Sequence, residues 1–222
     1  MKLSVVILTL LGVVFVGGLA SAVVTDHNYT VTAGWNLLGL PGIPLNPDPS
    51  KPHYQLPGVF GSIPVDGRLY RFDAATQGLY AYDEWAEPPT TFGNLLLADG
   101  YWLKADSSGN ISYSGLNDND AMDIWISMPR TGWILMGHPF SYSFPWKNAK
   151  VTDGNVTVSI ETAARTNGWL ESVGYWFNNQ TQGLVEIGLP DDYSPSVTLQ
   201  PWHGYWFKSK VDKIALIFES IP

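Results

Sequence analysis

The sequence predicts an all-β protein, and three observations support this fold class. The chain of 222 residues contains 22 Gly and 16 Pro, which interrupt regular elements and form turns. Aromatic residues make up 14% of the chain and are enriched in strands. Beyond the N-terminal segment, short runs alternate between apolar and polar residues, and no convincing run has the 3.6-residue hydrophobic period of a helix. We therefore expect short strands in sandwich-like or barrel-like sheets.

The first 22 residues have the pattern of a secretory signal peptide. Lys2 supplies the positive start, residues 5–16 are apolar and uncharged, and Ala20-Ser21-Ala22 is a small-x-small cleavage site. An uncleaved membrane anchor is the alternative, because residues 3–22 approach the length that spans a bilayer. The cleavage site and the lack of a basic stop-transfer flank favour cleavage. We expect a secreted or cell-surface, extracytoplasmic protein, with membrane contact only if the segment is retained.

Three blocks of sequence occur twice in the same order. They are Gly34–Pro41 and Gly132–Pro139, Arg71–Leu79 and Trp176–Leu184, and Gly100–Lys104 and Gly204–Lys208. The spacing between copies is nearly constant, at 98, 105 and 104 residues. Such a match indicates an internal duplication. We predict two homologous halves packed side by side, with a first β repeat at 23–116, a linker at 117–121 and a second β repeat at 122–222.

Alternation within the halves assigns faces to the predicted strands. Three strands are expected to bury every second residue: Tyr101, Leu103 and Ala105; Ile124, Ile126 and Met128; and Ile214, Leu216 and Phe218. Trp102 and Lys104 lie on the face opposite to Tyr101. Residues 156–161 predict a further strand, and only residues 161–165 suggest a short helix. Each Thr-Gln-Gly triplet predicts a hairpin turn in which Gly takes the positive φ.

The repeated pattern resembles an aromatic-rich β module of secreted, multidomain bacterial proteins. In that module a GWNL-x-G-x-P-like segment precedes a Trp, an aromatic hairpin and a GYW(V/F)K-like strand. The second half matches it through Gly132–Phe140, Trp146 and Leu199–Phe207, whereas the first half has Leu40 at an Asn position and a Pro-rich insertion at 41–57. The resemblance covers nearly all of the chain after residue 22. It implies an extracellular β module of mostly unassigned function, and it supplies no catalytic residues.

Composition and motifs argue against several function classes. With 12 basic and 20 acidic residues the net charge is -8, which disfavours nucleic-acid binding. The absence of Cys excludes disulfides and thiolate metal sites. The chain contains no nucleophile elbow, phosphate-binding loop or zinc motif, so we expect no enzyme activity, cofactor or metal. The acidic run at 118–123 is interpreted as part of a linker, although calcium ligation is an alternative.

The aromatic residues suggest a ligand, because exposed rings stack on sugar C–H groups. Trp35, Trp102, Trp133 and Trp206 are repeated, and we interpret them as core or sheet-packing residues. The predicted binding residues are instead the unrepeated Trp85 and Trp169, and Tyr82 and Tyr193 from the same region of the two halves. The N-x-Ser/Thr sequons that could be glycosylated are Asn28, Asn110, Asn155 and Asn179.

These observations favour a secreted, non-catalytic β module that binds carbohydrate or another cell-surface component. A structural protein of the cell envelope or of an extracellular assembly is the alternative, and it requires exposed strand edges or apolar patches. A glycoside hydrolase is the third hypothesis, because a catalytic pair of carboxylates cannot be located from the sequence of an all-β chain.

Overall fold

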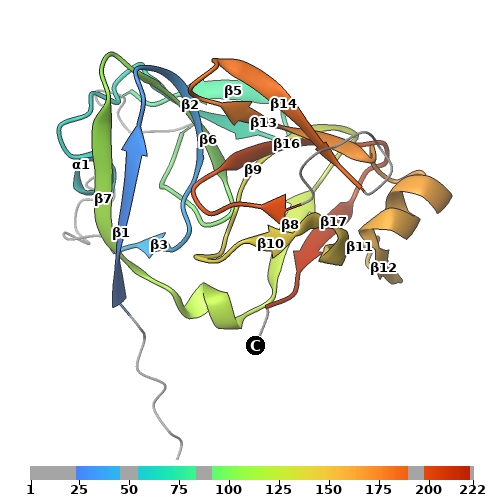
Figure 1. Cartoon of the computed structure of the whole chain (residues 1–222). Helices are drawn as coiled ribbons and strands as arrows, with labels where there is room; N and C mark the ends of the chain where they lie inside the picture. The colour runs from blue at the N-terminus through green and yellow to red at the C-terminus, as the bar shows by residue number, and fades with distance from the viewer. Residues whose placement is uncertain (1–23, 46–54, 84–91, 190–197, 221–222) are drawn as a thin grey trace, which may run out of the picture.

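The all-β prediction is confirmed by the computed structural model, which describes residues 24–45, 55–83, 92–189 and 198–220 (Figure 1). Most of these residues lie in antiparallel strands. The predicted signal peptide lies outside the described residues. Within the described residues, no helix has the length and apolar character needed to cross a membrane.

Residues 24–116, here called the first half, form two sheets. The three-stranded sheet has the order β1 (Val24–Val31), β7 (Gly109–Leu116), β3 (Ile43–Pro44). The four-stranded sheet has the order β2 (Gly34–Gly39), β6 (Gly100–Ala105), β4 (Leu69–Asp73), β5 (Gly78–Ala81). Helix α1 (Gln55–Phe60) covers part of the first half and buries Leu56, Val59 and Phe60. At six residues it is too short to show a hydrophobic period, so the sequence did not predict it.

Residues 122–220, the second half, form three sheets. One four-stranded sheet has the order β12 (Thr157–Ser159), β11 (Lys150–Thr152), β17 (Ile214–Phe218), β8 (Ile124–Met128). The other has the order β14 (Gly183–Gly188), β13 (Val173–Asn178), β16 (Gly204–Ser209), β9 (Gly132–Gly137). A small sheet joins β10 (Phe144–Pro145) to β15 (Thr198–Leu199). The remaining elements are the 3₁₀ turns η2 (Asp118–Ala121) and η3 (Trp146–Asn148) and the π-helical turn η4 (Thr162–Thr166).

Each half buries an apolar core with the predicted strand faces. Tyr101 and Leu103 of β6 are buried in the first half, and Tyr205 and Phe207 of β16 are buried in the second. The Phe207 ring stacks on the fully buried Trp146, with 4.2 Å between centroids. The strand predicted at 156–161 is shorter than expected, because Ile160 turns into the core and the chain continues into η4.

The two Thr-Gln-Gly hairpins form, but the prediction for their φ angles was wrong. Gln77 and Gln182, not the following glycines, adopt positive φ, at 56° and 54°. In both cases four residues separate the paired strand ends, and the last of them turns the chain into the second strand. The side chain of Asp73 accepts the backbone N–H of Ala75 at 2.7 Å, which stabilises the first loop.

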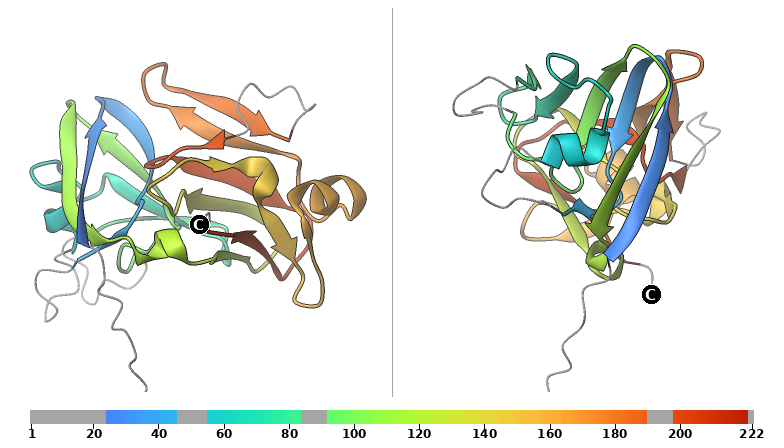
Figure 2. Two further views of the ribbon diagram at one scale, coloured as in Figure 1. Left: turned by 60° about the horizontal axis from the view of Figure 1, so that its bottom comes forward. Right: turned by 90° about the vertical axis from the view of Figure 1, so that its left-hand side faces the viewer.

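The halves lie side by side and contact each other through backbone (Figure 2). Gly137 of the second half donates its backbone N–H to the carbonyl of Ala98 in the first half at 2.8 Å, and Gly39 of the first half donates to the carbonyl of Trp202 at 2.9 Å. A Cβ built on Gly39 would lie 2.5 Å from the Cα of Gly137. Glycine is therefore required at this crossing because two backbones approach more closely than a side chain permits.

Candidate functional site: two aromatic surface pockets

Two of the three four-stranded sheets, β2-β6-β4-β5 and β14-β13-β16-β9, each carry an apolar pocket on their outward face. The larger, here called the Trp133 pocket, has a volume of about 390 Å³ and is lined by Trp133, Tyr175, Leu184 and Trp206. The smaller, here called the Trp35 pocket, has a volume of about 240 Å³ and is lined by Trp35, Leu79, Trp102 and Phe177. Leu79 and Leu184 are 53% and 60% exposed, so both pockets open to solvent.

Strand alternation places these side chains outward. In β6 the buried Tyr101 and Leu103 flank Trp102, so the Trp102 indole points away from the core. Trp35 lies directly across from Lys104 on the neighbouring strand. The Trp35 and Trp102 rings meet edge to face, with 5.9 Å between centroids and an interplanar angle of 88°. This arrangement leaves a corner between two indoles rather than a flat surface.

The Trp133 pocket has the same internal geometry. Trp133 and Trp206 meet edge to face at 6.1 Å and 87°, and Lys208 lies across from Trp133 on the neighbouring strand. The Nζ of Lys208 is 5.7 Å from the centroid of the Trp133 ring. In the Trp35 pocket, the Nζ of Lys104 is 5.8 Å from the Trp35 centroid. In each pocket, therefore, one of the two perpendicular indoles also contacts a lysine ammonium group.

A phenylalanine from the opposite half supports each pair of indoles. Phe177 of the second half contacts the Trp102 ring, and Phe72 of the first half contacts the Trp206 ring, each at 4.8 Å between centroids. The side of each ring that meets the phenylalanine is unavailable to solvent. The tryptophans are thus held in position before any ligand arrives, which lowers the entropy that binding would cost.

Glutamine side chains fix the same strands from the other half. Gln77 accepts the backbone N–H of Trp133 through Oε1 at 2.8 Å and donates to the Trp133 carbonyl through Nε2 at 2.8 Å. Gln182 makes the reciprocal pair with the N–H and carbonyl of Trp35, at 2.8 and 3.1 Å. We call these two sets of bonds the glutamine clasps. They act like single rungs of a β ladder, because one amide satisfies both backbone groups of a strand residue.

The glutamine clasps explain the glycine that precedes each of these tryptophans. Gly34 and Gly132 have φ of 97° and 139°. A Cβ on Gly132 would lie 2.3 Å from the Oε1 of Gln77, and one on Gly34 would lie 2.6 Å from the Oε1 of Gln182. Both the backbone angle and the close glutamine therefore require glycine here.

The structure places the two described members of the predicted binding set, Tyr82 and Trp169, outside both pockets. Tyr82 is 6% exposed and packs edge to face on Phe92 at 5.6 Å, so its ring presents no open face to a ligand. Trp169 is partly buried against the core of the second half. Trp85 and Tyr193 lie outside the described residues. The described members of the predicted set therefore do not form an exposed aromatic surface together.

The repeated tryptophans, interpreted from the sequence as core or sheet-packing residues, pack on the outer faces of the sheets. Trp133 is 37% exposed, and Trp35, Trp102 and Trp206 are half-buried, so all four combine packing with an accessible surface. A sequence signal for this position existed, because Trp102 shares its strand face with Lys104. A face that carries an exposed lysine is more often directed to solvent than to the core.

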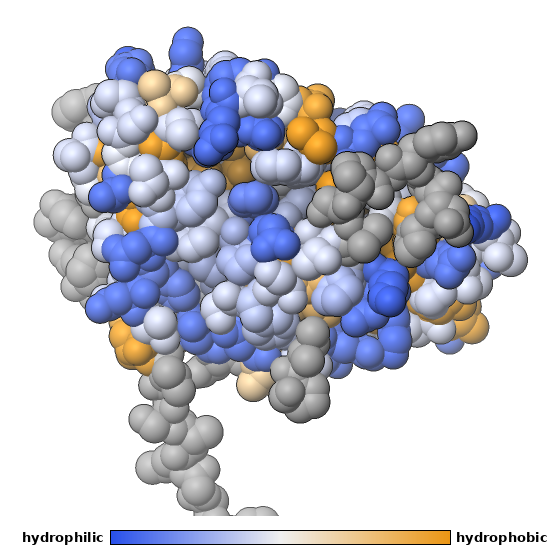
Figure 3. All heavy atoms as spheres, viewed as in Figure 1, coloured by the Kyte–Doolittle hydropathy of each residue, from blue (hydrophilic) through white to orange (hydrophobic). Residues whose placement is uncertain are grey.

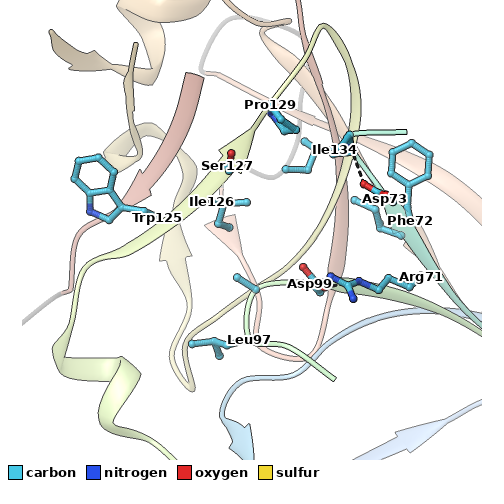
Figure 4. Close-up of a pocket in the computed structure, with 14 residues that line it drawn as sticks. Arg71, Phe72, Asp73, Leu97, Asp99, Trp125, Ile126, Ser127, Pro129 and Ile134 are labelled. Atoms are coloured by element: carbon cyan, nitrogen blue, oxygen red, sulfur yellow. Dashed lines mark hydrogen bonds and ion pairs between the residues drawn. The ribbon is translucent and has the colours of Figure 1, made fainter. Parts of the chain in front are cut away.

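A third, polar pocket of about 280 Å³ lies between the halves (Figure 4). Arg71 and Asp99 form an ion pair at 2.7 Å on one side of it, and the exposed Trp125 lies on the other side. Burial raises the pKa of Asp99 to about 6, although Arg71 opposes this shift. Arg71 also donates to the carbonyl of Phe92 at 2.9 Å, so its guanidinium is held by the protein itself.

The buried histidines have structural contacts. His138 is fully buried, and its Nε2 lies 2.6 Å from the carbonyl oxygen of Tyr142. Burial lowers the pKa of His138 to about 4, so the ring is neutral at physiological pH. His203 stacks on Trp176 at 4.9 Å, and burial also lowers its pKa. Within the described ranges, no group of three His, Cys, Asp or Glu side chains could hold a metal ion.

The predicted sequons differ in their surroundings. Asn28, Asn110 and Asn155 are exposed. Asn179 is half-buried, and its Nδ2 donates to the Oδ1 of Asn36 at 3.2 Å.

Hydrophilic residues cover much of the face shown in Figure 3, and its apolar residues form separate patches.

Comparisons with protein-family models, with curated proteins and with solved structures find no significant match for this chain.

Proposed function

We propose that this chain is a secreted, non-catalytic carbohydrate-binding protein whose binding sites are the Trp133 pocket and the Trp35 pocket. The observation that carries the proposal is the pair of half-exposed indoles in each pocket, held at about 90° by packing from both halves. The negative face of an indole attracts the polarised C–H groups of a pyranose ring. A corner of two indoles contacts one face and one edge of such a ring.

The dimensions of the pockets agree with this proposal. The Trp133 pocket, at about 390 Å³, lies at the small end of the range for ligand sites, about 300–1,000 Å³, and the Trp35 pocket, at about 240 Å³, lies just below that range. A single sugar unit of a chain is a small ligand whose neighbours extend into solvent. Pockets open on one side accept an internal unit of a polysaccharide, whereas an enclosed cavity accepts only an end.

We further propose that the two sites arose by duplication within the chain. The two four-stranded sheets that carry the pockets have the orders β2-β6-β4-β5 and β9-β16-β13-β14. Each strand of one sheet has a counterpart at the same place in the other. Matching residues also make matching bonds: the hydroxyls of Tyr101 and Tyr205 each accept a backbone N–H five residues earlier, at 2.7 Å. In both glutamine clasps and both Phe–Trp contacts, a residue of one half contacts a tryptophan of the other half.

The test is calorimetric titration of Trp35→Ala, Trp133→Ala and the double variant with soluble polysaccharides. We expect each single variant to halve the number of sites and the double variant to abolish binding. Trp125→Ala is the matched control, because Trp125 is 61% exposed and lines neither pocket. Binding by the double variant equal to wild type would refute the proposal. If the double variant instead lost only concentration-dependent self-association, the pockets would belong to an assembly protein.

A further inference from the structure

A lysine ammonium group lies over one indole of each aromatic pocket, in a protein whose net charge is -8. Lys104 lies over Trp35 and Lys208 over Trp133, and neither has a carboxylate within ion-pair distance among the described residues. Five of the ten described lysines and arginines have such partners, and Arg130, Lys147 and Lys213 are the other three without one. The five paired cations are Arg68, Arg71, Lys150, Arg165 and Lys210. The two lysines at the pockets are thus left without a counter-charge despite the excess of acidic residues.

Strand register explains why both lysines reach the tryptophans. Lys104 pairs with Trp35 across β6 and β2, and Lys208 pairs with Trp133 across β16 and β9. Directly opposed residues on one face of a sheet are near enough for their side chains to touch. A cation–π contact at an exposed site is weak. The ammonium can therefore leave the ring when a ligand offers a carboxylate.

We infer that both pockets select acidic sugars, in which a pyranose ring stacks on the indoles while its carboxylate pairs with Lys104 or Lys208. The inference rests on the proposed carbohydrate-binding function and specifies its ligand class as uronic-acid polysaccharides. A uronate unit offers an apolar C–H face and a negative group on the same ring. This matches a pocket that is lined by aromatic rings and has a lysine over one of its indoles.

The two pockets differ in one charged neighbour. Tyr175 of the Trp133 pocket lies directly across from Glu186, whereas Tyr70, which contacts Trp35, lies across from Ala81. Directly opposed residues share a sheet face, so Glu186 brings a carboxylate to the side of the Trp133 pocket only. We expect the Trp35 pocket to discriminate more strongly for acidic over neutral sugars.

The experiment compares an oligogalacturonate with a neutral galactose oligomer of equal length, titrated into wild-type protein and into Lys104→Gln, Lys208→Gln and the double variant. A charge-assisted bond to the sugar carboxylate supports an expected loss of about tenfold in affinity for the acidic oligomer at each altered pocket. Affinity for the neutral oligomer should stay within about twofold. Lys147→Gln is the control, because Lys147 is exposed and lies outside both pockets.

The outcomes separate this inference from the proposed function. Equal affinity for both oligomers, with unchanged binding in the lysine variants, would overturn the selection of acidic sugars even if the tryptophan variants still lost binding. Failure of the tryptophan variants to lose binding would instead refute the sites themselves. A sulfated dextran that bound as tightly as the oligogalacturonate would overturn the assignment to a sugar carboxylate, because attraction between charges alone would then suffice.

Discussion

The glutamine clasps predict a stability change that can be measured without any ligand. Gln77→Asn shortens the side chain by one methylene, so its amide no longer reaches the N–H and carbonyl of Trp133. Asparagine tolerates the positive φ of 56° at this position, so the hairpin loop is retained. The variant therefore removes the two bonds to Trp133 in the other half, together with the bond of 2.8 Å from the Nε2 of Gln77 to the carbonyl of Ala74 within the loop. Gln182→Asn does the same for Trp35.

The expected size of the effect follows from the bonds lost. Gln77 makes two bonds of 2.8 Å with Trp133, and each typical hydrogen bond contributes about 1 kcal/mol net to stability. Both lie near solvent, and water replaces part of what is lost. We therefore expect about 1–2 kcal/mol per single variant. The double variant should lose about the sum, because the two clasps hold different strands.

Thermal unfolding monitored by circular dichroism, together with urea titration, measures these changes. For a chain of this length, 1 kcal/mol corresponds to about 2–4 °C in Tm. Gln180→Asn is the control, because this exposed glutamine lies in the same hairpin loop as Gln182 and its side chain makes no hydrogen bond with another described residue. Tm values for Gln77→Asn and Gln182→Asn that matched the control would refute the reasoning.

Two further predictions concern pH and the backbone crossing. His138 has a folded-state pKa of about 4, below its ordinary 6.5, so its contribution to stability is present above pH 6.5 and is lost as pH falls through 4. The shift in the pKa of His138 corresponds to about 3 kcal/mol of stability. His138→Leu should remove this pH dependence, which urea midpoints at pH 7 and pH 4.5 would measure. An unchanged pH dependence in the variant would contradict the assignment of the effect to His138. The ionisation of Asp99 has the opposite effect on stability. Its pKa is raised to about 6, so its contribution to stability is lost as pH rises through 6. Asp99→Asn is therefore the reference variant that removes the opposite pH dependence. Gly39→Ala should cost at least about 2 kcal/mol, because its Cβ would lie 2.5 Å from the Cα of Gly137, and a Tm within 2 °C of wild type would show that the crossing can relax.

Local patterns in the sequence predicted the strands better than the site. Alternation identified the buried faces of β6, β8, β16 and β17, because a strand exposes every second residue to the same environment. The repetition of Trp102 and Trp206 indicated that tryptophan is required at these positions. It did not show whether the two side chains face the core or the solvent. The nearby Lys104, on the same strand face as Trp102, carried that information.

Contacts between distant residues account for what could not be predicted. Phe72 supports Trp206, and Phe177 supports Trp102, only because a hairpin of each half packs against the other half. Tyr82 packs against Phe92, which lies ten residues later in the sequence. Positive φ at Gln77 likewise depends on a loop of four residues, whose length the triplet itself does not reveal. None of these follows from periodicity along one strand.

The reciprocal exchange of Gln77 and Gln182 has a consequence for avidity. Because each half holds the strand that carries the other half's tryptophan, the two pockets keep one fixed spacing and orientation. Under the proposed function, a polysaccharide whose repeat matches that spacing engages both pockets at a high effective concentration. A polymer with another repeat binds through one pocket at a time. Under this proposal, the glutamine clasps determine which polysaccharide repeat length binds most tightly. Variants that loosen the clasps would bind polymers with a wider range of repeats, and their affinity for the matching polymer would be lower.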